Sequence, residues 1–361
     1  MRKYSYRSFL TALVLLMCTG LLAGCLFEGE QSLEKMDDPD EAVTTSPEAE
    51  DDGSEPEKDG EKAEDSTEQE STATVPRELY LLDANGMIAP QTLELPASQE
   101  VASQALEYLV KDGPVTNLLP NGFEAVLPAG TEIIGLNTQD DGTLVVDVSE
   151  DFKNYEAEDE EKILQAMTYT LTQFDNVKRI KLWINGHEQE VMPVDGTPIS
   201  QGVSRADGIN NHVGVKRDVL NSKAVTVYFP AQNGEQVYHV PVTTRVAEDS
   251  DEYAARVEAL FEGPELGSSL TNPFHEGAEM VSSRLENGVL ALSFNEKILT
   301  GSDQPALSDA ALASLVLSMT DLDDVESVEV QVEGSEQVIN EAGEPLAEPV
   351  SRTDISGAEE M

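Results

Sequence analysis

The sequence predicts an α+β protein built of two tandem repeats, each a small mixed β-sheet with two helices packed on one face. Duplication is the first observation. Three pairs of segments match at an offset near 148, namely 106–114 with 257–264, 141–147 with 287–293, and 177–189 with 325–337. The second observation is that each copy contains both alternating apolar runs, typical of strands, and one-sided apolar stripes, typical of helices.

Each repeat begins with two apolar runs around an Asn-Gly pair, 79–82 and 92–95 in the first and 225–229 and 237–242 in the second. Asn-Gly supplies the positive φ that tight turns require. The spacing predicts a hairpin in the second repeat, while the first connection is longer than a minimal hairpin loop.

A helix follows in each copy. Ser98 is the predicted cap of the first, with a buried stripe of Val101, Ala105, Tyr108 and Leu109, and Ser250 precedes the second, with Tyr253, Val257, Leu260 and Phe261. Gly-Pro at 113–114 and at 263–264 is predicted to end both helices, because glycine adopts the left-handed cap and proline cannot continue the ladder.

The rest of each copy predicts a hairpin with Asp141-Gly142 or Asn287-Gly288 at its tip, a one-sided helix packed on the sheet, and a closing strand. The predicted domains are therefore 77–193 and 222–340. Residues 194–221, rich in glycine and polar residues, are expected to be a linker or a long ordered strap. Residues 341–361 are expected to be a flexible tail.

The N-terminus predicts export. A basic start precedes an apolar run that is too short to span a bilayer, so residues 1–24 resemble a lipoprotein signal peptide. Leu22, Ala23 and Gly24 precede Cys25 and resemble a lipobox, which implies lipid on Cys25 and a protein anchored to the outer face of the cell membrane. The alternative is an ordinary signal peptide with an incidental cysteine.

Net charge excludes some classes of function. The chain carries −48, which excludes a nucleic-acid binder because phosphate contacts need a basic face. Residues 25–76 are predicted to be the lipidated Cys25 followed by a disordered tether with a root-mean-square span of roughly 40 Å, because residues 28–76 hold many acids and no aromatic residue. Whether this tether binds a partner or is simply solvated stays open.

The residues themselves give no support for catalysis, a cofactor or a metal. After loss of Cys18 with the signal and use of Cys25 for lipid, no thiol remains. The spacing of a helical metal site is absent among the four histidines, His187, His212, His239 and His275. We interpret His187 as an exposed turn residue and His239 as partly exposed. Trp183 is expected to pack in or near the core.

Carboxylates are numerous enough for some to lie together by chance. Candidate acid/base pairs or calcium ligands are Glu132, Asp147, Glu150 and Asp151 in the first repeat and Asp321, Asp323 and Asp324 in the second. The second group lacks the glycine and distal glutamate of a calcium loop, so we interpret it as a helix end.

The lipobox, the acidic spacer and the two repeats, each with a helix ending in Gly-Pro, an Asp-Gly or Asn-Gly hairpin and a terminal strand, together resemble the spore germination GerM family. The repeat is similar to the GerMN domain. This resemblance implies an anchored lipoprotein in an envelope-spanning assembly between mother cell and forespore, acting in sporulation and germination without a catalytic residue.

Three functions follow from these observations. The favoured hypothesis is a non-enzymatic assembly or scaffold component with protein partners in a sporulation envelope complex, with self-association left open. The alternatives are a lipid-anchored extracytoplasmic ligand-binding protein, whose two domains would form a cleft, and a cell-wall hydrolase.

Overall fold

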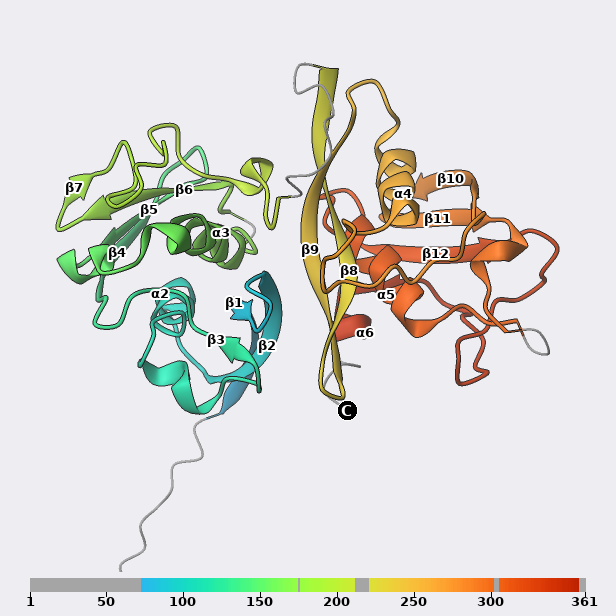
Figure 1. Cartoon of the computed structure of the whole chain (residues 1–361), viewed down its shortest axis with the longest axis horizontal. Helices are drawn as coiled ribbons and strands as arrows, with labels where there is room; N and C mark the ends of the chain where they lie inside the picture. Colours follow the sequence, from blue (N-terminus) through green and yellow to red (C-terminus); the bar gives the residue numbers. More distant parts are fainter. Residues whose placement is uncertain (1–72, 175, 212–220, 302–304, 357–361) are drawn as a thin grey trace, which may run out of the picture. The chain divides into compact units, whose positions relative to one another are not determined.

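The computed structural model describes residues 73–174, 176–211, 221–301 and 305–356. The predicted signal peptide, Cys25, the tether up to residue 72 and His212 lie outside the described residues. The part described is an α+β structure of two tandem repeats, which confirms the predicted fold class (Figure 1). None of its helices is long and apolar enough to cross a membrane.

The first repeat consists of a hairpin, two helices and a four-stranded sheet. The hairpin pairs β1 (Thr74–Asp83) with β2 (Ile88–Pro96), and the short β3 (Phe123–Glu124) lies on the other side of β1. The sheet has the order β4 (Ile133–Thr138), β5 (Thr143–Val148), β6 (Arg179–Ile184) and β7 (His187–Glu188). It is mixed, because β5 and β6 are parallel. The helices are α2 (Val101–Glu107) and α3 (Glu160–Leu171).

The second repeat follows the same order. Its hairpin is β8 (Ser222–Asn233) with β9 (Gln236–Ala247), and its sheet is β10 (Met280–Glu286), β11 (Val289–Phe294), β12 (Ser327–Val332) and β13 (Val350–Ser351). The helices are α4 (Glu252–Glu262), α5 (Asp309–Met319) and the short α6 (Arg352–Ser356). Single 3-10 turns occur at Pro114–Asn117, Glu150–Lys153, Ala157–Asp159, Arg205–Asp207 and Glu296–Ile298.

The second helix of each repeat is covered on two sides. In the second repeat α5 contacts both β8 of the hairpin and β12 of the sheet, and in the first α3 contacts both β1 and β6. Every residue from Ala311 to Met319 is buried. The expectation of a one-sided helix is therefore wrong for α5, because the hairpin forms a separate sheet over the face that would otherwise meet solvent.

The two Gly-Pro pairs behave differently. Helix α4 ends at Glu262 and Gly263 caps it with φ of 82°, as predicted. Helix α2 ends earlier, at Glu107, because the chain turns to place Val110 in a bridge with Leu127. The predicted cap is also wrong: the hydroxyl of Ser98 accepts from the Glu100 amide, and α2 has no side-chain cap.

The expected linker and tail are largely ordered. Within 194–221, Val203 forms a bridge with Ile180 of β6, and residues 194–211 run as a strap along the first repeat; residues 212–220 lie outside the described part. Within 341–361, β13 pairs with β12 and α6 follows. The tail prediction is thus wrong for residues 350–356. Val350 pairs with Val328 of β12, just as Val203 pairs with Ile180 of β6 in the first repeat.

Candidate functional site

The two repeats meet through equivalent residues. Tyr80 and Tyr228 are 148 positions apart, both fully buried, and their hydroxyl oxygens are 3.4 Å apart. Each backbone amide donates to a hydroxyl on the second helix of its own repeat, Tyr80 to Thr170 (3.0 Å) and Tyr228 to Ser318 (2.9 Å). The contact between the repeats is therefore approximately symmetric at this point.

Two arginines lie at equivalent positions of the repeats, although they stack on tyrosines that are not equivalent. Arg205 and Arg352 each end a Val-Ser-Arg sequence in which the valine pairs with the closing strand of its repeat. The Arg205 guanidinium lies 4.7 Å from the centre of the Tyr169 ring, and that of Arg352 lies 5.1 Å from the centre of the Tyr228 ring. Such cation–π contacts are favourable, more so when desolvated.

The same motif continues to an aspartate. In Val-Ser-Arg-x-Asp, Asp207 accepts from the Ser204 amide (2.7 Å) and Asp354 accepts from the Ser351 amide (2.8 Å). We call 203–207 and 350–354 the closing motifs. The sequence reasoning missed them because it ended the repeats at 193 and 340, although an identical tripeptide at an offset of 147 was a readable signal.

Asp321 supplies the negative charge between the arginines. Its carboxylate accepts from the Arg205 guanidinium at 2.7 Å and lies 4.0 Å from that of Arg352, which also lies 4.0 Å from Glu78. Burial lowers the pKa of both arginines, but the nearby phenols and Asp321 outweigh it and raise the pKa of each above the usual value. Glu78 contributes to the raised pKa of Arg352. We call Glu78, Tyr80, Tyr169, Arg205, Tyr228, Asp321 and Arg352 the junction cluster.

The strap adds further bonds between the repeats. The side chain of Asn210 donates to the carbonyls of Ile88 on β2 (2.7 Å) and Pro241 on β9 (2.8 Å), and accepts from the Ile88 amide (2.9 Å). Nearby, the Tyr238 hydroxyl donates to Asp83 at 2.7 Å. The junction therefore consists of hydrogen-bonded polar groups as well as apolar contacts.

A buried carboxylate holds the strap to the first repeat. Glu160, 1% exposed at the start of α3, accepts from the amides of Val194, Asp195 and Thr197 and from the Tyr155 hydroxyl. Burial opposes ionisation, but these donors prevail and lower its pKa to about 2. Ser308 stands at the corresponding start of α5 and acts as an ordinary helix cap.

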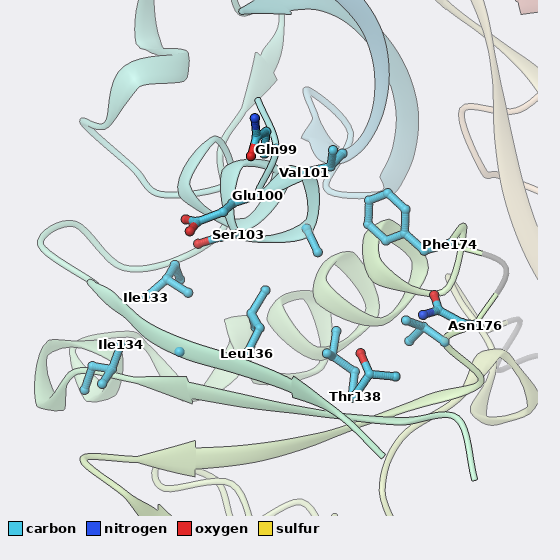
Figure 2. A pocket seen from close by; sticks show the side chains of 14 residues that line it. Gln99, Glu100, Val101, Ser103, Ile133, Ile134, Leu136, Thr138, Phe174 and Asn176 are labelled. Atoms are coloured by element: carbon cyan, nitrogen blue, oxygen red, sulfur yellow. The ribbon is translucent and has the colours of Figure 1, made fainter. Parts of the chain in front are cut away.

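The first repeat contains a cavity of about 570 Å³ between α2 and β4. We call it the first-repeat groove. Figure 2 shows α2 on one side, Ile133, Leu136 and Thr138 of β4 on the other, and Phe174 and Asn176 at one end. The remaining lining residues include Ala102, Leu144 and Val177. The sequence does not indicate this groove, because its walls combine apolar residues with polar ones that form no recognisable motif.

The predicted carboxylate groups do not come together as a catalytic pair or a metal site. Asp147 accepts from the Gly186 amide, Glu150 pairs with Lys153, and Asp151 accepts from Asn154, while Glu132 is exposed. Asp321, Asp323 and Asp324 follow the end of α5, as interpreted from sequence. In the described ranges, no three His, Cys, Asp or Glu side chains are grouped to hold a metal.

The remaining candidates lie at separate places. His187 is exposed beside the Asn185–Gly186 turn, and His275 is also exposed. His239 is 5% exposed, so the expectation of partial exposure is wrong; its strand β9 is packed on both faces near the junction. Trp183 is half-buried on β6.

The fold and junction define a class: tandem α+β repeat proteins whose two copies are joined through equivalent residues. A family model described as "Germane: Sporulation and spore germination" matches residues 78–190 and 226–338. The chain belongs to this family. It is 43% identical over 343 residues, covering 92% of this chain and 93% of the relative, to the spore germination protein GerM of Bacillus subtilis (strain 168).

A solved structure is similar as well. The tandem GerMN domains of the sporulation protein GerM from Bacillus subtilis superimpose with a TM-score of 0.72 at 47% identity, covering 77% of this chain and 98% of that one. The resemblance inferred from the sequence is thereby confirmed.

Proposed function

We propose that this protein is a non-enzymatic, lipid-anchored assembly component that acts in sporulation and spore germination at the outer face of the membrane. The observation that carries the proposal is the junction cluster. Charged and aromatic side chains from both repeats meet there in one bonded network, which favours a single arrangement of the tandem. A tandem held in one arrangement presents its surfaces to protein partners at fixed spacing.

Family membership supports the biological setting, since the relative is named for spore germination. The Leu22 to Cys25 sequence supports the anchor. Support for a non-enzymatic role comes from the bonding of the candidate carboxylates, since most accept from neighbouring backbone or side-chain donors and are spread over several elements.

The test uses the full chain with a C-terminal tag in sporulating cells, crosslinked before extraction. The wild type is expected to be membrane-bound and crosslinked to other proteins, and Cys25→Ser is expected to lose both. Loss of germination from a single exposed carboxylate substitution, with crosslinking and folding unchanged, would instead indicate an enzyme.

Ligand binding is the second candidate, and the first-repeat groove is the observation that favours it. Its volume of about 570 Å³ falls in the range of small-molecule sites, roughly 300–1,000 Å³. A small-molecule ligand would raise the melting temperature of the purified protein in proportion to the logarithm of its concentration.

A further inference from the structure

The second repeat indicates what fits the first-repeat groove. The matched helices align Ala102 of α2 with Tyr253 of α4, and the matched closing segments align Asn176 with Asp324. Hydrogen bonds support the latter alignment: the backbone amides of Lys178 and Glu326 donate to the carbonyls of Gly142 and Gly288, respectively, each at 2.8 Å. Ala102 and Asn176 both line the groove.

In the second repeat the tyrosine spans this place. The Tyr253 hydroxyl donates to the Asp324 carboxylate at 2.9 Å, so the side chain reaches from the helix to the segment after α5. Burial and this bond to Asp324 raise the pKa of Tyr253 to about 12. The first repeat has only a methyl group at that position, and the space is left as a cavity.

The groove also borders an exposed sheet edge. Among the described strands β4 has one neighbour, β5, and its other edge offers backbone groups to an added strand. Ile134 on β4 is 53% exposed, which is unusual for a large apolar side chain beside a cavity. An extended segment placed along β4 would cover it.

Exposed acids lie around the groove, and the positive charge of Arg179 acts on one of them, Asp141. Glu100 is the charged residue in the described lining, and Glu132 and the pair Asp140-Asp141 stand at the two ends of β4, all exposed. Backbone and side-chain hydrogen bonds from Thr143 lower the pKa of Asp141. No Lys or Arg occurs in β4 or in the lining that the structure describes.

We propose that the first-repeat groove binds an extended segment of a partner protein that inserts an aromatic side chain where Tyr253 lies in the second repeat, with Lys or Arg beside the aromatic residue. A tyrosine would donate to the Asn176 amide oxygen as Tyr253 donates to Asp324. The flanking cations would face Glu100 and the acids at the ends of β4. This inference deepens the proposed function by stating the chemistry of one partner.

The test is a selection in vitro with the purified full chain and phage-displayed random peptides of about twelve residues, long enough to follow β4 and continue beyond it. Wild-type protein is expected to enrich peptides with an aromatic residue next to Lys or Arg. Ala102→Tyr, which copies the second repeat, is expected to weaken the selected peptides by about tenfold or more, because the ring site is then occupied.

Matched controls separate the groove from general effects. Ala157→Tyr places the same residue at an exposed site before α3 and is expected to leave affinity unchanged. Glu100→Lys alters only an exposed charge and is expected to weaken the basic peptides severalfold, whereas Glu158→Lys is expected to have little effect. These charge variants keep the test decisive if Ala102→Tyr fails to fold.

Three results would overturn the proposal: enrichment of no aromatic-basic pattern, equal binding of the selected peptides to Ala102→Tyr, or a wild-type dimer that Ala102→Tyr dissociates, which would assign the groove to a second copy. The crosslinking experiment in cells is independent of this selection. If the protein assembles in cells but the selection enriches no such peptides, only the proposal for the groove fails. If such peptides are selected but the protein is not crosslinked to others in cells, only the proposed function fails.

Discussion

The two repeats share a framework, and at two of the places where they differ a single side chain changes what the first repeat can bind or hold. Both end in a closing motif, and both carry a tyrosine at the junction. However, Ala102 leaves a cavity where Tyr253 fills one, and Glu160 binds a strap where Ser308 caps a helix. The duplicated residues build the fold and the junction, while the substituted ones give the first repeat its own surface.

The largest predicted effect concerns the asymmetric charge of the junction cluster. Asp321 corresponds to Gln173 in the first repeat, so only one repeat supplies this carboxylate. Asp321→Ala is expected to lower the free energy of unfolding by about 3–5 kcal/mol, because it removes the carboxylate that pairs with Arg205 at 2.7 Å and lies 4.0 Å from Arg352. Urea denaturation measures this.

The neighbouring Asp323 is exposed, and Asp323→Ala is the matched control, expected to change stability by about 0.5 kcal/mol or less. If Asp321→Ala and Asp323→Ala changed the free energy of unfolding equally, the junction cluster would not stabilise the contact between the repeats through Asp321.

The second prediction tests the strap. The pKa of Glu160 falls from 4.5 in the unfolded chain to about 2 in the folded protein. Its contribution of about 3 kcal/mol is therefore present above pH 4.5 and is lost as the pH falls toward 2. Glu160→Gln is expected to lose most of it at pH 7 and to show a shallower acid dependence, measured by denaturation at several pH values.

The exposed neighbour Glu161 provides the control, since Glu161→Gln should keep the wild-type acid dependence. A steep acid transition that survives in Glu160→Gln would assign the effect to other carboxylates.

The third prediction sharpens the symmetry of the junction. Tyr80→Phe and Tyr228→Phe are each expected to cost about 1 kcal/mol, because each removes one partner of a buried hydrogen bond. The double variant should cost less than the sum, since the two hydroxyls share that bond. Strict additivity in a double-mutant cycle would show that the hydroxyls do not interact.

The smallest effect concerns charge. Residues 77–361 carry −35, so self-repulsion opposes folding of both repeats. The melting temperature is expected to rise between low and moderate salt by an amount corresponding to about 1 kcal/mol or less. A melting temperature that stays flat or falls over this range would argue that the acids are spaced too widely to repel one another.

Much of the fold was predictable because its signals are local. Asn287-Gly288 forms a turn with positive φ, as its residue types require, and Gly263 ends α4 for the same reason. The prediction that α2 ends at Gly113 was wrong, because the chain leaves the helix earlier to form a β-bridge between Val110 and Leu127. The groove could not be predicted, since an alanine in an amphipathic helix does not indicate whether the opposite wall fills the space that it leaves.

The sequence by itself determined the duplication, the order of elements and the family, because repeated apolar patterns and turn residues act over a few neighbouring positions. It also contained the repeated Val-Ser-Arg-x-Asp, although only the structure shows that both motifs bring an arginine to the junction. The meeting of Tyr80 with Tyr228 was decided by tertiary structure alone. Such contacts join residues 148 positions apart, and their existence depends on how two packed surfaces fit rather than on any local preference of the chain.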